Sequence, residues 1–125
     1  MFKNKVMQLI RLVLEYLRFR VVNNYGRYTF FTASDIVEDF LMWRVRWLRK
    51  RQLLMRVKSI IEEFVDLGFV RVYSRNARGK IYVITPDSPL FKLFKNGSDL
   101  DTVVNYLCND LGLKSCEIYL CKPSL

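Results

Sequence analysis

Hydrophobic residues recur every three or four positions in two long stretches of this chain. The first stretch predicts a helix over Phe2–Val22, and the second predicts a helix over about Trp47–Leu67. Between them, the aromatic and β-branched run Tyr28–Phe31 predicts a short strand. Thr32 can cap a further helix over about Ala33–Met42. The first half of the chain therefore predicts the order helix, strand, helix, helix.

The hydrophobic pattern changes to alternation after the second long helix. Gly68 stands where a left-handed helix cap is expected, and Phe69–Tyr73 and Lys80–Ile84 then alternate as two strands. Residues 75–79 predict the loop of a hairpin, which ends at Pro86. A two-stranded hairpin is therefore expected to follow the long helix.

Residues 87–125 predict a smaller appended segment beside a domain over residues 1–86. Pro89–Phe94 predicts a helical turn, Ser98 can cap a helix over about Asp99–Leu111, and Cys116–Leu120 predicts a last strand. The apolar stripe of the appended helix consists of Val103, Val104, Leu107 and Leu111. Two interpretations fit this stripe, because it can pack back on the core or join two copies as a homodimer.

The net charge of +9 is unevenly distributed along the chain. Residues 1–80 hold 17 Lys and Arg against 7 Asp and Glu, whereas residues 81–125 hold 4 against 5. A basic part beside a neutral part is typical of a protein in which one part faces a polyanion. The charge therefore favours nucleic-acid contact through the first two thirds of the chain.

The long helix and the segment before it carry one run of basic residues. No acid occurs from residue 42 to residue 58, and Glu62, Glu63 and Asp66 follow only afterwards. This order is opposite to the one that the helix dipole prefers, and phosphate contact is a natural reason for it. Glutamine can pair with adenine, and arginine with guanine. The candidate DNA-binding residues of this region are Arg44, Arg46, Arg49, Lys50, Arg51, Gln52, Arg56 and Ser59.

The predicted hairpin is basic as well. No acid lies between Phe69 and Ile84. Its candidate DNA-binding residues are Arg71, Arg75, Arg78 and Lys80. Arg75 and Arg78 flank the loop tip, from which they can follow the phosphate backbone or enter a narrow minor groove. The alternative for both basic clusters is a solvated polar surface.

The order of elements over about residues 5–85 resembles the winged helix-turn-helix family. The resemblance is carried by Thr32-Ala-Ser-Asp-Ile-Val, by the helix-to-strand step Asp66-Leu67-Gly68-Phe69-Val70, and by the hairpin that ends at Thr85. It implies an α+β domain whose third helix lies in the major groove of double-stranded DNA. It also implies that the hairpin wing touches the backbone or the minor groove, and that the protein is a transcription regulator or another reader of DNA sequence.

The segment before the long helix departs from the family pattern. A tight turn is usual there, whereas Met42–Lys50 holds two tryptophans and four basic residues. Trp43 and Trp47 are four residues apart, so they are neighbours if the third helix begins early. The segment is then either an extension of that helix or a docking surface for a protein partner. The candidate partner-binding residues are Trp43 and Trp47 together with Val103, Val104, Leu107 and Leu111.

The chain lacks the residues that most catalytic and metal sites need. It contains no histidine, no CxxC pair and no phosphate-binding glycine loop, so we expect no enzyme, metal or cofactor, and we infer no small-molecule ligand. No apolar run approaches the ~20 residues of a membrane span, and charges interrupt the first helix. We therefore expect a cytoplasmic protein without membrane contact. Its cysteines are expected as buried free thiols, with a Cys116–Cys121 disulfide as the alternative.

A second function also fits the sequence. Winged helices serve as protein-interaction adaptors in larger assemblies, and the tryptophan segment suits a docking face. An adaptor would bind DNA weakly and with little dependence on salt. The high usage of Arg, Tyr and Val with only two Gln resembles proteins of hot-spring archaea or their viruses.

Overall fold

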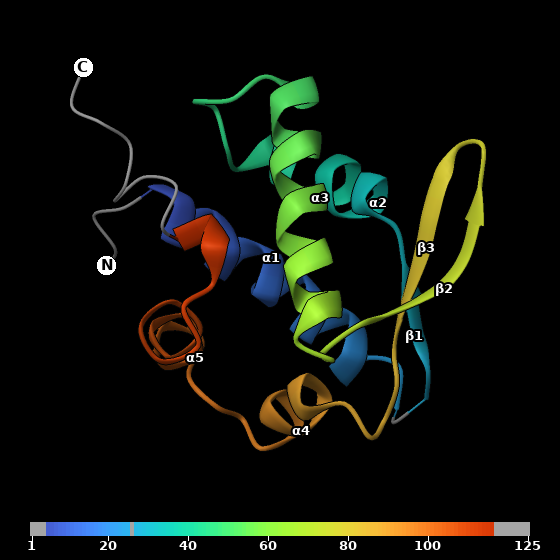
Figure 1. The fold of residues 1–125 in the computed structure, drawn as a ribbon, viewed down its shortest axis with the longest axis vertical. Helices are drawn as coiled ribbons and strands as arrows, with labels where there is room; N and C mark the ends of the chain where they lie inside the picture. Colours follow the sequence, from blue (N-terminus) through green and yellow to red (C-terminus); the bar gives the residue numbers. More distant parts are fainter. Residues whose placement is uncertain (1–4, 26, 117–125) are drawn as a thin grey trace.

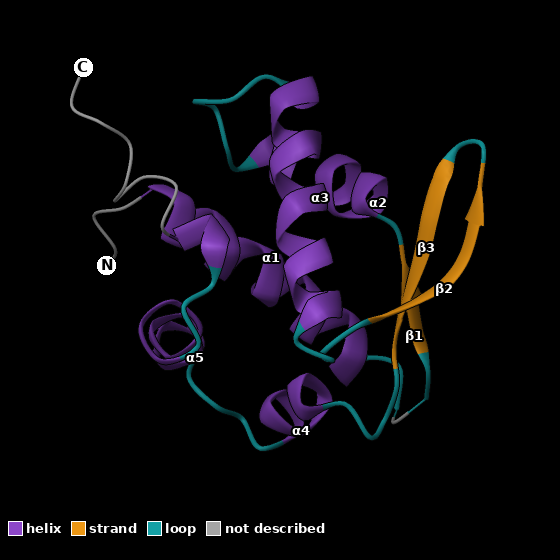
Figure 2. Ribbon diagram, in the orientation of Figure 1, coloured by secondary structure: helices purple, strands orange, loops and turns teal. Residues whose placement is uncertain are grey.

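The computed structural model describes residues 5–25 and 27–116 of the chain. Its elements, in chain order, are α1 (Lys5–Val22), β1 (Thr29–Phe31), α2 (Ala33–Asp39), the 3₁₀ helix η1 (Leu41–Trp43), α3 (Lys50–Asp66), β2 (Arg71–Asn76), β3 (Gly79–Ile84), α4 (Pro89–Lys95), α5 (Leu100–Asn105) and the π-helical turn η2 (Tyr106–Asp110). Helix α1 crosses behind α3, and the sheet covers one side of the helices. Helix α4 lies at the bottom and α5 at the lower left (Figures 1 and 2).

Helix α1 supplies the largest part of the hydrophobic core. The predicted stripe is confirmed, since Val6, Leu9, Ile10, Val13, Leu17 and Val21 are all buried, and Leu14 is buried beside them. Side chains from α2, α3, α4 and α5 complete the same cluster. All the described helices therefore share one core.

Helix α2 begins as predicted but ends earlier. The Thr32 hydroxyl accepts a hydrogen bond from the amide of Asp35, and the Asp35 carboxylate accepts one from the amide of Thr32, which completes a capping box. The helix was predicted to continue to Met42, but it ends at Asp39 and the chain tightens into η1. Leu41 is fully buried by this tighter turn, so packing of its side chain favours η1 over continued α-helix.

Helix α3 begins later than its sequence predicts. Its first residue is Lys50 rather than Trp47, because Val45 is buried and holds the preceding segment as an irregular loop. The side-chain oxygen of Gln52 accepts a hydrogen bond from the amide of Arg49 and so caps the start of the helix. Gly68 has a φ of +79°, which confirms the predicted left-handed cap at the other end.

The three strands form an antiparallel sheet in the order β1-β3-β2. The hairpin loop is shorter than predicted, since Asn76 pairs with Gly79 and only Ala77 and Arg78 remain in the turn. Gly79 follows the turn with a φ of +134°, which a side chain would disfavour. A bulge between Val72 and Ser74 leaves Tyr73 without a cross-strand partner. The hairpin thus stands up beside α2 and α3 (Figure 1).

The C-terminal helices pack on α1. Val103, Val104 and Leu107 are buried there, so the structure assigns the apolar stripe of α5 and η2 to the core, and only Leu111 of the four candidates is exposed. The predicted cap was wrong by one residue, because the Asp99 carboxylate and not Ser98 accepts the hydrogen bond from the amide of Thr102. The helix also ends its α-helical part at Asn105 rather than at Leu111.

A disulfide joins Cys108 and Cys116, whose Cα atoms are 5.6 Å apart. The reversal of the chain at Gly112, which has a φ of +63°, brings the two residues together. The expectation of free thiols is therefore wrong for this pair. The predicted strand Cys116–Leu120 and the alternative partner Cys121 lie outside the described residues, except for Cys116 itself.

The α+β fold class is confirmed, and the order of elements is winged-helix-like. Within residues 5–25 and 27–116, no helix is long and apolar enough to cross a membrane.

Candidate nucleic-acid interface

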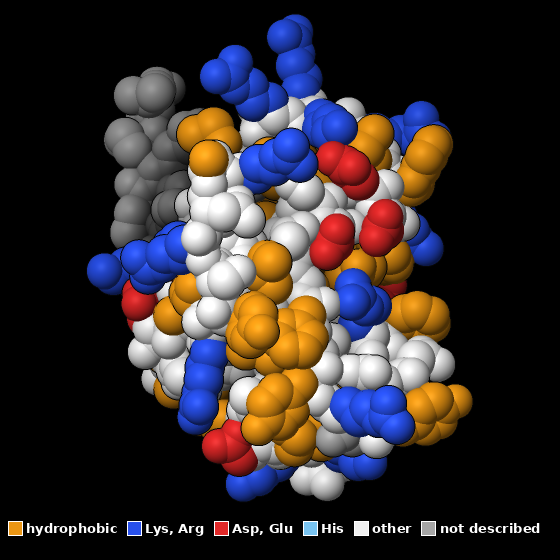
Figure 3. Space-filling model, turned by 90° about the vertical axis from the view of Figure 1, so that its right-hand side faces the viewer, with side chains coloured by type: hydrophobic (Ala, Val, Ile, Leu, Met, Phe, Trp, Pro, Cys, Tyr) orange, Lys and Arg blue, Asp and Glu red, His pale blue; other side chains and the backbone are white. Residues whose placement is uncertain are grey.

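Basic residues gather at one end of the molecule. The start of α3, the loop before it and the tip of the β2–β3 hairpin all lie at the upper end in Figure 1. Figure 3 shows several Lys and Arg side chains projecting from that end. The exposed residues that form this cationic end are Arg44, Arg46, Arg49, Lys50, Arg51, Arg75 and Arg78. The structure therefore brings residues of both predicted basic clusters to one end of the molecule.

Arg44 in the loop before α3 and Lys50 at the start of α3 each contact a neighbouring side chain. Arg44 folds back, with its guanidinium carbon 3.8 Å from the centre of the Phe40 ring. Lys50 forms an ion pair with Glu38 of α2 at 3.4 Å. Arg44, Lys50 and Glu38 are all exposed, where such contacts are weak. The two residues are therefore positioned by the fold but can still exchange these contacts for a phosphate.

Trp43 and Trp47 do not form the predicted pair on a helix face. Trp43 ends η1 and is 70% exposed, whereas Trp47 lies in the following loop and packs against the core. The ammonium group of Lys5 lies 5.3 Å from the centre of the Trp47 ring. The two side chains therefore have separate surroundings, because the segment between them is not helical.

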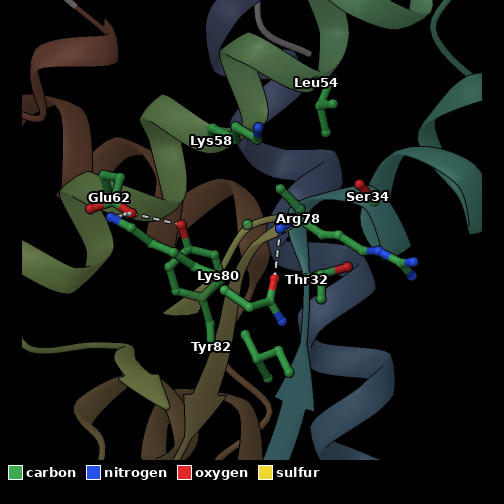
Figure 4. A pocket seen from close by; sticks show the side chains of 12 residues that line it. Thr32, Ser34, Leu54, Lys58, Glu62, Arg78, Lys80 and Tyr82 are labelled. Carbon is green, nitrogen blue, oxygen red and sulfur yellow. Dashed lines mark hydrogen bonds and ion pairs between the residues drawn. The ribbon is translucent and has the colours of Figure 1, made fainter. Parts of the chain in front are cut away.

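A groove of about 700 Å³ separates the hairpin from α2 and α3. Leu54, Lys58 and Glu62 of α3 form one wall (Figure 4). The remaining lining residues are Thr32, Ala33 and Ser34 at the start of α2 and Asn76, Arg78, Gly79, Lys80, Ile81 and Tyr82 of the hairpin. The groove thus lies between the elements that the winged-helix resemblance assigns to DNA.

Two cationic side chains line this groove from opposite walls. Lys58 projects over it from α3, and the Arg78 side chain extends from the hairpin tip toward the start of α2 (Figure 4). The Asn76 side chain accepts a hydrogen bond from the amide of Arg78 at 2.8 Å, which fixes the turn. The hydroxyl groups of Thr32 and Ser34 lie at the same wall as the Arg78 guanidinium. The groove can therefore offer positive charge and hydroxyl groups to an anionic chain.

No protein-family model, no curated protein and no solved structure matches this chain. Among the described residues, no group of three His, Cys, Asp or Glu side chains could hold a metal ion. The cationic end itself offers positive charge, hydrogen-bond donors and a groove.

The face of α3 that the sequence assigned to DNA is exposed at most of its positions in the structure. Arg51 and Gln52 are exposed at the cationic end, although the Gln52 oxygen already caps the helix. Arg56 is half-buried and, with Ser59, lines a shallow pocket of about 250 Å³ beside Val6. The Ser59 hydroxyl donates to the carbonyl of Met55 at 3.2 Å. Ser59 is exposed like Arg51 and Gln52, so among these residues only Arg56 is partly withdrawn from the surface.

The structure also adds residues that the sequence did not single out as a site. Lys58 belongs to the basic run, but it lies four residues after Leu54 on the flank of α3 that turns toward the hairpin. Ser34 follows the cap of α2 and carries no charge. Periodicity alone predicts which residues of a helix lie opposite its apolar stripe. It does not predict that a residue on the side of the helix, such as Lys58, faces another element, because the position of that element must be known first.

The acidic residues in the C-terminal half of α3 accept hydrogen bonds from other parts of the fold. The Glu62 carboxylate accepts hydrogen bonds from the Lys80 ammonium at 2.8 Å and from the Tyr82 hydroxyl at 2.6 Å. Glu63 accepts hydrogen bonds from the amide and hydroxyl of Ser115. These contacts tie α3 to the hairpin and to the C-terminal segment. They supply a second reason for the charge order of α3, beside the phosphate contact that the sequence suggested.

Two predicted wing cations have carboxylate partners. Lys80 is held by Glu62, and Arg71 lies 3.6 Å from Asp87. Lys80 therefore positions the hairpin, whereas Arg75 and Arg78 are exposed nearer its tip. The hydrogen bond from Lys80, followed by the one from Tyr82, holds the pKa of Glu62 below its ordinary value of 4.5. Burial and the same carboxylate raise the pKa of Tyr82.

Acid is expected to weaken the link between α3 and the hairpin. Because the pKa of Glu62 is lower in the folded state, the ionised group stabilises the fold above pH 4.5. That contribution is lost as the pH falls through the folded-state pKa. Glu62→Gln removes it, so the free energy of unfolding should fall less between about pH 6 and about pH 3 in the variant than in the wild type. Urea unfolding at both pH values measures the difference.

Glu38→Gln is the matched control, since Glu38 is an exposed carboxylate that pairs with Lys50. It should show the acid dependence of the wild type. Equal acid dependence of Glu62→Gln and the wild type would contradict the role of Glu62.

Proposed function

We propose that this protein is a winged-helix protein that binds double-stranded DNA and reads its sequence as a transcription regulator. The observation that carries the proposal is the placement of charge. Cations from the loop before α3, from the start of α3 and from the hairpin tip share one end of the molecule. Duplex DNA presents a dense row of phosphates, and such a cluster neutralises several at once.

The groove suggests how the duplex docks. The first turns of α3 enter the major groove, so that Arg51 faces base edges there. The hairpin then lies over the adjacent backbone or minor groove, with Arg78 at its tip. A phosphate strand between these two contacts passes Lys58 in the groove. In this arrangement α3 supplies sequence reading and the other cations supply position.

A salt series tests the proposal. Fluorescence anisotropy with a random-sequence duplex should give an affinity that falls steeply with salt, with a slope corresponding to about five or more phosphates. Little binding at low salt would reject the proposal. A slope near zero with measurable binding would reject the electrostatic docking in particular.

An adaptor function is the second candidate. Trp43 is 70% exposed and its neighbour Met42 is 39% exposed, so the loop before α3 offers an apolar surface. Aromatic side chains in such a position are frequent anchors at protein interfaces. If duplex binding fails, Trp43→Ala should then weaken capture of a protein partner.

A further inference from the structure

The sheet has an aromatic outer face that the duplex-binding arrangement does not use. Phe30 of β1 and Tyr73 of β2 meet there with ring centres 4.8 Å apart and an interplanar angle of 71°. They are 38% and 64% exposed, respectively. Tyr28, which is 58% exposed, lies just before β1 and two residues from Phe30. Large aromatic side chains gathered on a solvent-facing sheet indicate a binding surface.

The backbone presents these rings in a fixed way. The bulge at Val72/Ser74 leaves Tyr73 without a cross-strand partner, and its ring then leans over β3 to reach Phe30. The Arg20 guanidinium donates to the Phe30 carbonyl at 2.7 Å. The Asn24 side chain donates to the Tyr28 carbonyl at 2.7 Å. The platform formed by Tyr28, Phe30 and Tyr73 is therefore anchored from α1 and the turn after it.

The charge around the platform suits an anionic ligand. Hydrophobic side chains gather over the lower half of the sheet side of the molecule, and Lys and Arg side chains border them (Figure 3). Arg71 stands opposite Val83, which in turn stands opposite Phe30, so Arg71 belongs to the same face. Its ion pair with Asp87 is long, at 3.6 Å, and joins two exposed side chains, so Arg71 can exchange it for a phosphate. Exposed rings bordered by cations match nucleobases that are joined by phosphates.

We propose that this platform binds single-stranded nucleic acid by stacking unpaired bases on Tyr73, Phe30 and Tyr28. Bases inside a duplex cannot reach such rings, because their faces are already stacked. The platform lies on the outer face of the sheet, whereas Lys80 and Tyr82 turn inward to Glu62 at the groove. The two surfaces are distinct, so this inference does not depend on duplex binding.

Anisotropy with fluorescein-labelled oligo(dT) and oligo(rU) of about 15 nucleotides tests the platform. The wild type should bind at low salt, and Tyr73→Ala should lose about 5- to 100-fold in affinity. Phe30→Ala should lose affinity as well, and Tyr73→Trp should keep it. Comparison of the two oligonucleotides shows whether DNA or RNA is preferred.

Tyr106→Ala is the control, because Tyr106 is 46% exposed on η2 outside the sheet. It should bind as the wild type does. Absence of single-strand binding, or equal binding by Tyr73→Ala and the wild type in a folded state checked by circular dichroism, would overturn the proposal. Concentration-dependent self-association that Tyr73→Ala abolishes, without single-strand binding, would instead assign the face to contact between copies. Failure of duplex binding, with single-strand binding retained, would contradict the proposed function but support the platform.

Discussion

Replacing Lys58 and Arg78 together with alanine should lower the affinity for duplex DNA by about 30-fold at about 0.15 M salt. The two side chains extend from opposite walls of the groove and would hold the same phosphate strand. Each phosphate contact contributes about 0.9 to the slope of log affinity against log salt, so the slope should fall by about two. Anisotropy titrations of wild type and double variant across a salt series measure both changes.

Lys92→Ala with Lys95→Ala is the charge-matched control. Both lysines are exposed on α4, away from the hairpin tip, and their removal changes the net charge by the same amount. The control should keep most of the affinity and nearly the wild-type slope. Equal losses in the two double variants would mean that net charge alone attracts DNA, without the groove.

The second large effect is expected in the core. Leu107→Ala should lower the free energy of unfolding by about 2–5 kcal/mol, because Leu107 is fully buried and its removal leaves a cavity. The residue belongs to the cluster that α1 and α3 also line, so unfolding should remain a single transition. Urea unfolding followed by circular dichroism and by tryptophan fluorescence measures both quantities.

Leu111→Ala separates this effect from a general loss of hydrophobic surface. Leu111 lies four residues later and is 37% exposed, so its removal should change the free energy of unfolding by less than about 1 kcal/mol. Two separate transitions in Leu107→Ala would show that residues 87–116 fold apart from the rest, against the shared core.

Local signals were sufficient to predict most of the fold. A hydrophobic period of 3.6 residues predicts the helices α1 and α3, and alternation of apolar and polar residues predicts the two hairpin strands. The cap at Thr32 and the left-handed Gly68 are decided within a few residues, so they were predicted correctly. The segment between α2 and α3 was not, because burial of Leu41 and Val45 against distant residues decides its path. Such tertiary packing leaves no periodic signal.

The candidate site was predicted in its charge but not in its shape. The basic run before and within α3 and the basic hairpin could be read directly from the sequence. Their meeting at one end depends on the ties from Glu62 to Lys80 and Tyr82, which join residues 18 and 20 positions apart. The same ties remove Lys80 from the set of exposed wing cations. Lys58 lines the groove only because the hairpin stands beside α3.

Mapping of backbone amide shifts by NMR with a short duplex tests duplex binding at the cationic end most directly. At 15.0 kDa the protein is small enough for two-dimensional spectra of every amide. The expected result is that shifts concentrate at the first turn of α3, around Lys58 and at Ala77 and Arg78 of the hairpin tip, with α4 and α5 unchanged. No shifts at low salt, or shifts confined to α4 and α5, would contradict duplex binding at the cationic end.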